Sequence, residues 1–298
     1  MIHYLILAHN NLDQLELLVN KLKTKNSRIY IHLDKKIKDF KKLENVNYIK
    51  DRQDITRWWT KMLKAELIWL SEISKNMEEW DHVVILSWQC FPIKPIDYIE
   101  KKIGDLKEKS CILCFDAKES TLNRICKYNF FDVNFRIPKK INNFFVKILS
   151  YFKKFDTDIK LPVINAAIGE LVSFVLPRRT YLTNKYTIYW GSSWMALSYP
   201  HVKFLVDFIK SDEWKKVLKH FKYTANNDEV FFQTILVNNK KDEIVNKMLW
   251  YTIWKDWAAS PNYLTIEDLE GIKKSDKLFA RKFDINKDKK VLEILNAL

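Results

Sequence analysis

The first third of the chain alternates short apolar runs with amphipathic stretches, and this alternation constrains the fold more than any other feature. Apolar runs that end at polar turn residues predict buried strands, and leucines spaced by three and four residues predict the helices between them. The predicted strands cover residues 2–7, 28–33, 46–49 and 82–87, and the predicted helices cover residues 12–22, 61–73 and a segment from Asp97. We therefore predict an α/β fold with a doubly wound, mostly parallel central sheet.

Polar residues follow each predicted strand. His9 and Asp34 follow the first two strands, residues 56–59 follow the third, and residues 87–90 follow the fourth. In doubly wound sheets, ligands bind beyond the carboxyl ends of the strands. We therefore expect these positions, including Arg57, to border a ligand site.

The composition restricts how this chain could bind an anion. The sequence has 51 Lys and Arg against 37 Asp and Glu residues, which gives a formal charge of +14. This excess favours a polyanionic partner, an anionic membrane surface or an anionic donor substrate, and charge alone does not choose among them. Only four glycines occur, and the glycine-rich phosphate-binding patterns are absent. A diphosphate would therefore have to be held by side chains.

The cysteines and the first residues bear on the cellular compartment. Four cysteines are present, and Cys111 and Cys114 have the spacing of one half of a zinc site. No second pair or histidine partner follows them, so we predict that they are core residues. The first residues lack a basic leader segment, and no run of about 20 apolar residues occurs. We therefore expect a protein of the reducing cytoplasm.

Residues 224–234 predict the start of a helix. Asn226 or Asn227 can serve as the N-cap, Asp228 and Glu229 fall in the first turn, and an apolar face begins at Val230. Carboxylates in a first turn often do no more than complement the helix dipole. A glutamate held as an anion at this position is also suited to act as a general base.

Six motifs of the sequence occur in an order known from one family of enzymes. They cover residues 4–9, 31–36, 86–94, 191–194, 228–234 and 279–284. In these motifs the chain resembles the core-2/I-branching β-1,6-N-acetylglucosaminyltransferases (glycosyltransferase family 14), a family that also contains xylosyltransferases. The resemblance spans nearly the whole chain and is weakest over residues 115–185.

The resemblance implies a fold and a domain organisation. It implies a single GT-A-like, Rossmann-type nucleotide-sugar-binding domain over residues 1–298. Residues 1–115 would form the nucleotide-binding half, residues 116–185 a variable insertion, and residues 186–298 the acceptor and catalytic half. It also implies inversion at the anomeric carbon, with no divalent metal and no cofactor beyond the nucleotide-sugar donor.

The resemblance also assigns residues to the donor side. Glu229 matches the catalytic base, Lys282 matches a residue that binds the donor diphosphate, and Asp34 matches a residue near the uridine. The family's diphosphate-binding arginine has no clear match, and either Arg281 or Lys255 could take its place. Arg281 and Lys282 could equally be a surface pair between buried phenylalanines. His9 and Arg57 are further candidates for donor contacts.

Aromatic residues are the candidates for the acceptor side. The resemblance places an acceptor-contacting cluster near Trp250, Tyr251 and Trp254, and Trp194 could offer a similar flat apolar face. For any one of these tryptophans, burial in the core is the alternative. Asp228 is a further candidate on the acceptor side, and it could also support the helix start or a neighbouring donor group rather than share the proton transfer, because adjacent helical residues point apart.

These observations lead to a functional hypothesis with open alternatives. We expect an enzyme that moves N-acetylglucosamine from UDP-N-acetylglucosamine to a hydroxyl of a surface glycan. The basic aromatic segment 142–155 suggests peripheral contact with an anionic membrane and a lipid-linked acceptor. Transfer of xylose or another sugar remains open, as does a metal-dependent enzyme using Asp156 and Asp158. The rival of another class is a non-catalytic basic module, although no nucleic-acid recognition pattern is present and we expect no such partner.

Overall fold

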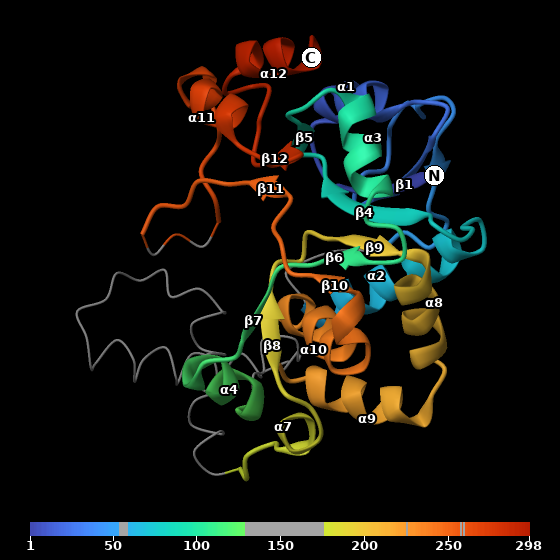
Figure 1. The fold of residues 1–298 in the computed structure, drawn as a ribbon, viewed down its shortest axis with the longest axis vertical. Coiled ribbons are helices and arrows are strands. Elements are labelled where there is room, and N and C mark those ends of the chain that lie inside the picture. The colour runs from blue at the N-terminus through green and yellow to red at the C-terminus, as the bar shows by residue number, and fades with distance from the viewer. Residues whose placement is uncertain (54–58, 129–175, 225, 257, 259) are drawn as a thin grey trace, which may run out of the picture.

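The computed structural model describes residues 1–53, 59–128, 176–224, 226–256, 258 and 260–298 (Figure 1). Arg57, segment 142–155 and the pair Asp156 and Asp158 lie outside the described residues. Most of the predicted insertion 116–185 lies outside them too. Within the described ranges, no helix has the length and hydropathy that crossing a bilayer requires.

A seven-stranded sheet forms the centre of the molecule, in the order β10-β6-β9-β4-β1-β2-β3. Its strands are β1 (Ile2–Ala8), β2 (Ser27–Leu33), β3 (Asn47–Tyr48), β4 (His82–Ser87), β6 (Ser110–Cys111), β9 (Ala196–Ser198) and β10 (Ile244–Val245). All neighbouring pairs are parallel except those of β9, which runs antiparallel to β4 and to β6. The predicted mixed α/β fold with a mostly parallel sheet is confirmed.

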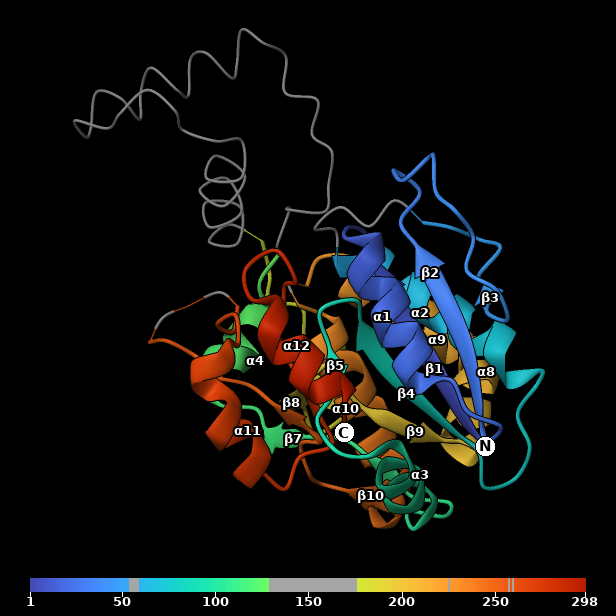
Figure 2. The ribbon, with the colours of Figure 1, turned by 90° about the horizontal axis from the view of Figure 1, so that it is seen from above.

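Helices cover both faces of this sheet (Figures 1 and 2). Because side chains alternate along a strand, Tyr4 and Ile6 of β1 enter one core while Leu5 and Leu7 enter the other. The first core includes α1 (Leu12–Leu22), α3 (Ile96–Gly104) and α12 (Lys289–Asn296), and the second includes α2 (Trp59–Ser74), α8 (Tyr199–Phe208), α9 (Asp212–Phe221) and α10 (Asp228–Lys240).

The sequence of residues 189–197 predicts a single strand, but the structure has two strands there, β8 (Tyr189–Gly191) and β9. Strand β8 pairs with β7 (Cys114–Asp116) in a two-stranded ribbon outside the central sheet. A Cβ atom at Gly191 would lie 1.9 Å from the Leu113 carbonyl oxygen, so the close approach of these strands requires glycine there. The Gln233 amide donates to the Ser192 carbonyl at 2.8 Å and holds the intervening turn against α10.

A three-stranded sheet joins the last motif to the segment after β4. It consists of β11 (Trp250–Tyr251), β12 (Phe279–Ala280) and β5 (Phe91–Pro92), with β12 in the middle. The Arg281 amide donates to the Tyr251 carbonyl at 3.0 Å, and the Phe283 amide donates to the Gln89 carbonyl at 2.9 Å. These bonds fix Arg281 and Lys282 beside the carboxyl end of β4. The α11 segment (Leu269–Lys274) precedes β12, after a 3-10 turn (Ile266–Asp268) capped by Thr265.

Helix α10 is the most deeply embedded helix of the second core. Its residues 230–237 are all buried, whereas the sequence predicted an apolar face only. The predicted side-chain cap is also wrong. Asn227 occupies the N-cap position in helical geometry without a side-chain cap bond, and its amide donates to the Phe221 carbonyl at 3.3 Å. Packing on several sides therefore replaces capping as the stabilising contribution.

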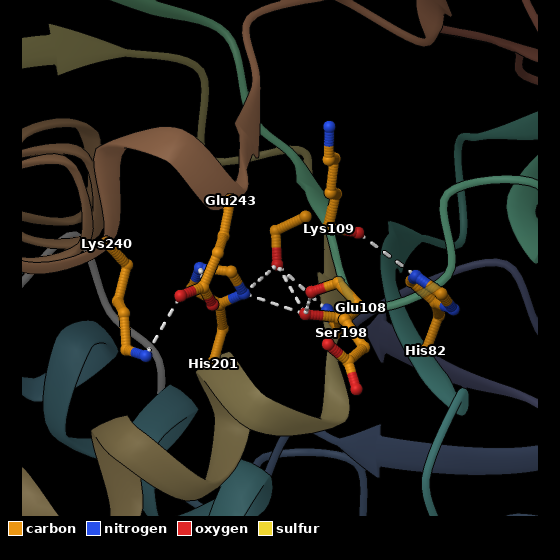
Figure 3. Close-up of polar contacts among 8 residues, drawn as sticks. His82, Glu108, Lys109, Ser198, His201, Lys240 and Glu243 are labelled. Atoms are coloured by element: carbon orange, nitrogen blue, oxygen red, sulfur yellow. Dashed lines mark hydrogen bonds and ion pairs between the residues drawn. The ribbon is translucent and has the colours of Figure 1, made fainter.

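A cluster of paired polar groups anchors the other end of α10 (Figure 3). His201 Nδ1 lies 2.9 Å from Ser110 Oγ and 2.7 Å from Ser198 Oγ, which ties α8 to β6 and β9. The Lys240 ammonium donates to Glu243 at 3.0 Å, and Glu243 lies 3.9 Å from His201 Nε2. Burial lowers the pKa of His201 to about 4, so its imidazole is neutral at neutral pH. We call these five residues the His201 cluster.

Candidate active site

A cavity of about 600 Å³ opens between the β7–β8 ribbon, the start of α10 and the segment after β11. Five residues predicted from the sequence line it: Trp194, Asp228, Glu229, Trp254 and Arg281. They come from four separate parts of the chain. The fold therefore brings the candidate base, a candidate diphosphate-binding cation and candidate acceptor aromatics into one space.

Glu229 is half-buried at the edge of this cavity. Its amide donates to the Asn226 carbonyl at 3.2 Å, and the Asn226 side-chain amide donates to Glu229 Oε2 at 3.1 Å. Asn226 has a φ of 50°, a left-handed conformation that asparagine tolerates better than most residues. Burial, followed by the charge of Asp228, raises the pKa of Glu229, against the opposing effect of the Asn226 bond. A raised pKa suits a carboxylate that must accept a proton near neutral pH.

Asp228 lines the same cavity with a different partner. Ser193 Oγ donates to Asp228 Oδ2 at 2.8 Å and so connects the turn after β8 to α10. Burial raises the pKa of this carboxyl group as well. Behind it lies Glu66 of α2, which is 1% exposed, and burial followed by the charge of Asp228 raises the pKa of Glu66 well above its ordinary value. Three carboxyl groups therefore compete for protons at the start of α10.

Arg281 brings a cation to the cavity. Its guanidinium carbon lies 4.1 Å from the centre of the Trp194 ring, and its Nε is buried without a hydrogen-bond partner. Among the described residues, it forms no ion pair. Burial lowers the pKa of this guanidinium, with the nearby Cys90 acting in the opposite direction. A desolvated cation without a counter-charge is costly, and an anionic ligand would relieve that cost.

Lys282 lies beside the cavity without lining it. Its ammonium donates to Ser260 Oγ at 2.9 Å and lies 4.4 Å from the centre of the Tyr263 ring. Burial, followed by the charges of Arg281 and Lys287, lowers its pKa. Ser260 does line the cavity, so the Lys282 ammonium lies directly next to it.

His9 and Asp34 lie at the carboxyl ends of β1 and β2, and neither lines the cavity. The His9 ring packs edge-on against Trp88 at 5.8 Å, and Asp34 Oδ1 accepts the Lys36 amide at 2.9 Å. The Asp34 carboxylate also acts electrostatically on His9. Their place at the strand ends is the one expected for donor contacts, and their role stays a prediction.

The comparison with known proteins agrees with the motifs. A family model described as "Branch: Core-2/I-Branching enzyme" matches residues 2–273. The chain belongs to this family.

Curated relatives of this core-2/I-branching family member carry the names of two kinds of transferase. Beta-glucuronosyltransferase GlcAT14A of Arabidopsis thaliana is 29% identical over 119 residues, which is 37% of this chain and 25% of that protein. Xylosyltransferase oxt of Drosophila melanogaster is 34% identical over 113 residues, which is 32% of this chain and 13% of that protein. A xylosyltransferase of Ciona intestinalis is 22% identical over 319 residues, which is 98% of this chain and 33% of that protein. The chain thus spans a third or less of the length of these relatives.

Two of the predicted acceptor residues lie elsewhere in this family member. Trp250 is 2% exposed and stacks on Phe279 at 5.4 Å, so its ring faces are taken up by the core. Its place in β11 beside β12 explains this burial, which corrects the prediction that it offers a face to an acceptor. Tyr251 does not line the cavity either, because its hydroxyl group packs against Gly271.

The ribbon supplies aromatic residues that the sequence did not reveal. Phe115 and Trp190 line the cavity, and their ring centres lie 5.3 Å apart. They are register partners of β7 and β8, two strands far apart in the sequence. Only knowledge of this pairing could have found them, because each residue alone resembles an ordinary strand aromatic.

Arg179 is a second residue that the sequence did not reveal. Its guanidinium donates to the carbonyls of Ile125 at 2.7 Å and Tyr223 at 2.9 Å, and also to the carbonyls of Lys127 and His220. It therefore joins the end of α4 (Glu119–Cys126) to the end of α9, directly before Asn226 and Glu229. This side chain fixes the segment from which the candidate base projects.

The sequence raised two possible metal sites, one at Cys111 and Cys114 and one at Asp156 and Asp158, and the second pair lies outside the described residues. In the part of the chain that the structure describes, no group of three His, Cys, Asp or Glu side chains is placed to ligate a metal ion. Cys111 donates to the Lys247 carbonyl at 3.2 Å, and burial raises its pKa to about 11, as befits a core thiol. All four cysteines are free and buried.

Proposed function

We propose that this chain is an inverting glycosyltransferase that moves a sugar from a UDP-linked donor to a hydroxyl of a surface glycan. The proposed donor is UDP-N-acetylglucosamine, and the reaction is proposed to need no divalent metal. One observation carries the proposal: Glu229 and the unpaired Arg281 line the same cavity. A base and a cation in one space are what a single displacement with an anionic leaving group requires.

Glu229 is the proposed general base. It accepts the proton of the acceptor hydroxyl while that oxygen attacks the anomeric carbon and the bond to the diphosphate breaks. The Asn226 amide holds Oε2, which leaves Oε1 for the acceptor. Burial and Asp228 raise the pKa of Glu229 and thus strengthen it as a base, while the helix N-terminus still favours its anionic form.

Arg281 is the proposed partner of the leaving group. The diphosphate gains charge as the bond breaks, and a fixed guanidinium stabilises that charge without reorganisation. Stacking on Trp194 holds the guanidinium in place before the donor binds. Lys282 supplies a second positive charge from beside Ser260. His9 and Asp34 are proposed to contact the nucleoside at the strand ends, in keeping with their position in the sheet.

The acceptor is proposed to lie against the aromatic surface of the cavity. Trp194, Trp190 and Trp254 offer apolar faces suited to the carbon side of a sugar ring. The names of the relatives favour a second donor class, because they specify glucuronosyl and xylosyl transfer. UDP-xylose and UDP-glucuronic acid are therefore the alternative donors.

A panel of nucleotide sugars tests this proposal. UDP-N-acetylglucosamine, UDP-xylose and UDP-glucuronic acid are each supplied with a glycan array as acceptor, with and without a chelator. We expect one donor to support transfer that survives the chelator. The Glu229→Gln variant should lower kcat by about 10²- to 10⁴-fold while it still binds UDP.

One control variant and three contrary outcomes complete the test of this proposal. Glu270→Gln changes an exposed glutamate of α11 and should leave transfer unchanged. Near-normal turnover by Glu229→Gln would contradict the base assignment. Activity that the chelator abolishes and added metal restores would favour the metal-dependent alternative. Nucleic-acid binding without transfer from any donor would favour the non-catalytic module.

A further inference from the structure

A further cavity lies at the edge of the central sheet opposite to the candidate active site. Ile2, Asn26 and His82 line it from the amino ends of β1, β2 and β4, whereas the candidate active site lies toward the carboxyl end of β4. Strand β4 has six residues and so separates the two edges by about 20 Å. The cavity has a volume of about 370 Å³, which is within the range typical of ligand sites. Its other lining residues include Trp80, Asp97, Glu100, Lys101 and Gly104.

Trp80 presents its indole ring at this cavity in a strained backbone conformation. Its φ is 73°, in the left-handed region, which is rare for a bulky residue. The flanking residues fix this conformation. His82 Nδ1 lies 3.2 Å from the Trp80 carbonyl oxygen, and Asp81 Oδ2 accepts the Glu78 amide at 2.9 Å. The ring is 52% exposed, so packing in the core does not explain the strain, and strained residues of this kind are typical of functional sites.

Helix α3 forms another wall of the cavity. Asp97, Lys101 and Gly104 are spaced by four and three residues and so share one face of this helix. Ile99 and Ile103 pack in the first core instead. Packing does not require glycine at position 104, because a Cβ atom there would meet no other atom within 4 Å, and its φ is not left-handed. Glycine stabilises a helix less than alanine does, and here its missing side chain leaves the cavity open.

The polar groups of this cavity suit a ligand that carries hydroxyl groups. Asp97 offers carboxylate oxygens as acceptors, and Lys101 offers ammonium donors. Among the described residues, neither side chain has a hydrogen bond or an ion pair. Glu100, by contrast, is occupied, since it accepts the Asn26 side-chain amide at 2.8 Å. Two unpaired groups of opposite charge beside a flat indole face favour a neutral sugar ring over a cation or a phosphate.

We propose that this cavity binds a neutral sugar unit of a glycan, at a site separate from the site of transfer. The sugar ring stacks on Trp80, and its hydroxyl groups bond to Asp97 and Lys101. The open space at Gly104 accommodates the ring. This inference goes beyond the proposed function and does not require Glu229 to act as a base.

Nuclear magnetic resonance of the full chain tests this inference. In protein labelled with ¹⁵N at tryptophan, the Trp80 indole signal is assigned by its absence in Trp80→Gly. Neutral oligosaccharides of N-acetylglucosamine, xylose, glucose or galactose are then titrated into the protein, and their affinity is measured by calorimetry. We expect at least one series to shift the Trp80 signal until it saturates, while UDP leaves the signal in place. Trp80→Gly should weaken binding of that series by about tenfold or more, because the stacking surface is lost.

Three variants separate binding from folding. Trp80→Gly relieves the left-handed strain, so its unfolding temperature should not fall even though binding is lost. Gly104→Gln fills the cavity and should also weaken binding by about tenfold or more, although the surrounding atoms leave room for a side chain. Tyr98→Ala removes another exposed aromatic ring, on α3 but outside the cavity lining, and should bind as wild type does.

Two outcomes would overturn the inference. One is a Trp80 signal that no oligosaccharide shifts, or that responds to UDP or to peptides in place of sugars. The other is an affinity that neither Trp80→Gly nor Gly104→Gln changes. Because no donor is present in these measurements, their outcome does not depend on whether the proposed transfer reaction takes place.

Discussion

The two ends of α10 place buried polar groups in opposite situations. At its N-terminal end, burial raises the pKa values of Asp228 and Glu229, and the neighbouring Arg281 has a buried Nε without a partner. At its C-terminal end, the His201 cluster pairs serines with a neutral imidazole and Lys240 with Glu243 (Figure 3), and the uncharged His201 Nε2 is its one buried atom without a hydrogen bond among the described residues. Helix α10 therefore joins two different regions. In the first, the Arg281 cation has no counter-charge among the described residues, and we call this region electrostatically incomplete. In the second, most polar groups have a partner.

This difference separates groups that the fold needs from groups that a ligand would complete. Buried polar groups with partners stabilise the packing of β6, β9 and α8. Buried charges without partners destabilise a protein, and they are typical of sites where a substrate supplies the missing charge. By this criterion, the His201 cluster is structural even though it combines serine, histidine and glutamate. All of its serine and histidine side chains are inaccessible to a substrate.

The largest effect in this comparison is expected from Arg281→Met. Loss of the guanidinium should lower kcat/KM for the donor by about 10²-fold or more, because the leaving diphosphate loses a fixed cation. Affinity for UDP alone should fall as well. The same change should raise the free energy of unfolding by about 1 kcal/mol, because a partly buried cation without an ion-pair partner among the described residues is replaced by an apolar chain.

Steady-state kinetics, calorimetry with UDP and urea unfolding measure these three quantities. Lys273→Met provides a control on α11, away from the cavity. Unchanged UDP affinity in Arg281→Met, or a loss of stability, would show that the guanidinium is a structural group and would remove the contrast between the two ends.

A smaller effect is expected at the His201 cluster. The pKa of His201 is about 4 in the folded protein and 6.5 by ordinary values, so the unfolded chain binds a proton first as the pH falls. Its stabilising contribution is thus complete above pH 6.5 and is lost as the pH falls toward 4. The His201→Asn variant should show a shallower decline of unfolding free energy in this window, by up to about 1.4 kcal/mol per pH unit.

Urea unfolding at several pH values between 6.5 and 4 provides this slope. His32 and His220 also have pKa values lowered to about 4 by burial, so part of the decline should remain in the variant. A slope identical to wild type would mean that His201 is protonated in the folded protein. The C-terminal end of α10 would then hold an additional charge, and the contrast with its N-terminal end would be lost.

Local patterns and tertiary pairing explain what the sequence could and could not predict. The strands β1, β2 and β4 and the helix α1 follow from periodicity, because each buries its own apolar set against the sheet. The division of residues 189–197 does not, because it depends on the contact of Gly191 with Leu113, far away in the chain. The burial of Trp250 likewise depends on its pairing with Phe279.

The residues of the candidate site divide in the same way, into those that local motifs predict and those that depend on tertiary contacts. Glu229, Asp228 and Arg281 were identified from short motifs, and the fold brings them to one cavity. Phe115, Trp190 and Arg179 act through strand register and carbonyl contacts between distant helices, and no local pattern signals such contacts. The candidate catalytic residues were thus more predictable than the residues that position them.

The titration of Glu229 tests the central claim most directly. In protein labelled with ¹³C at glutamate side chains, the Glu229 signal is assigned by its absence in Glu229→Gln, and its chemical shift is followed with pH. We predict a midpoint above the ordinary 4.5, since burial and Asp228 both oppose ionisation. In Asp228→Asn the midpoint should move downward. A midpoint at or below 4.5 in wild type, unchanged by Asp228→Asn, would contradict the claim that the start of α10 is an electrostatically incomplete catalytic site.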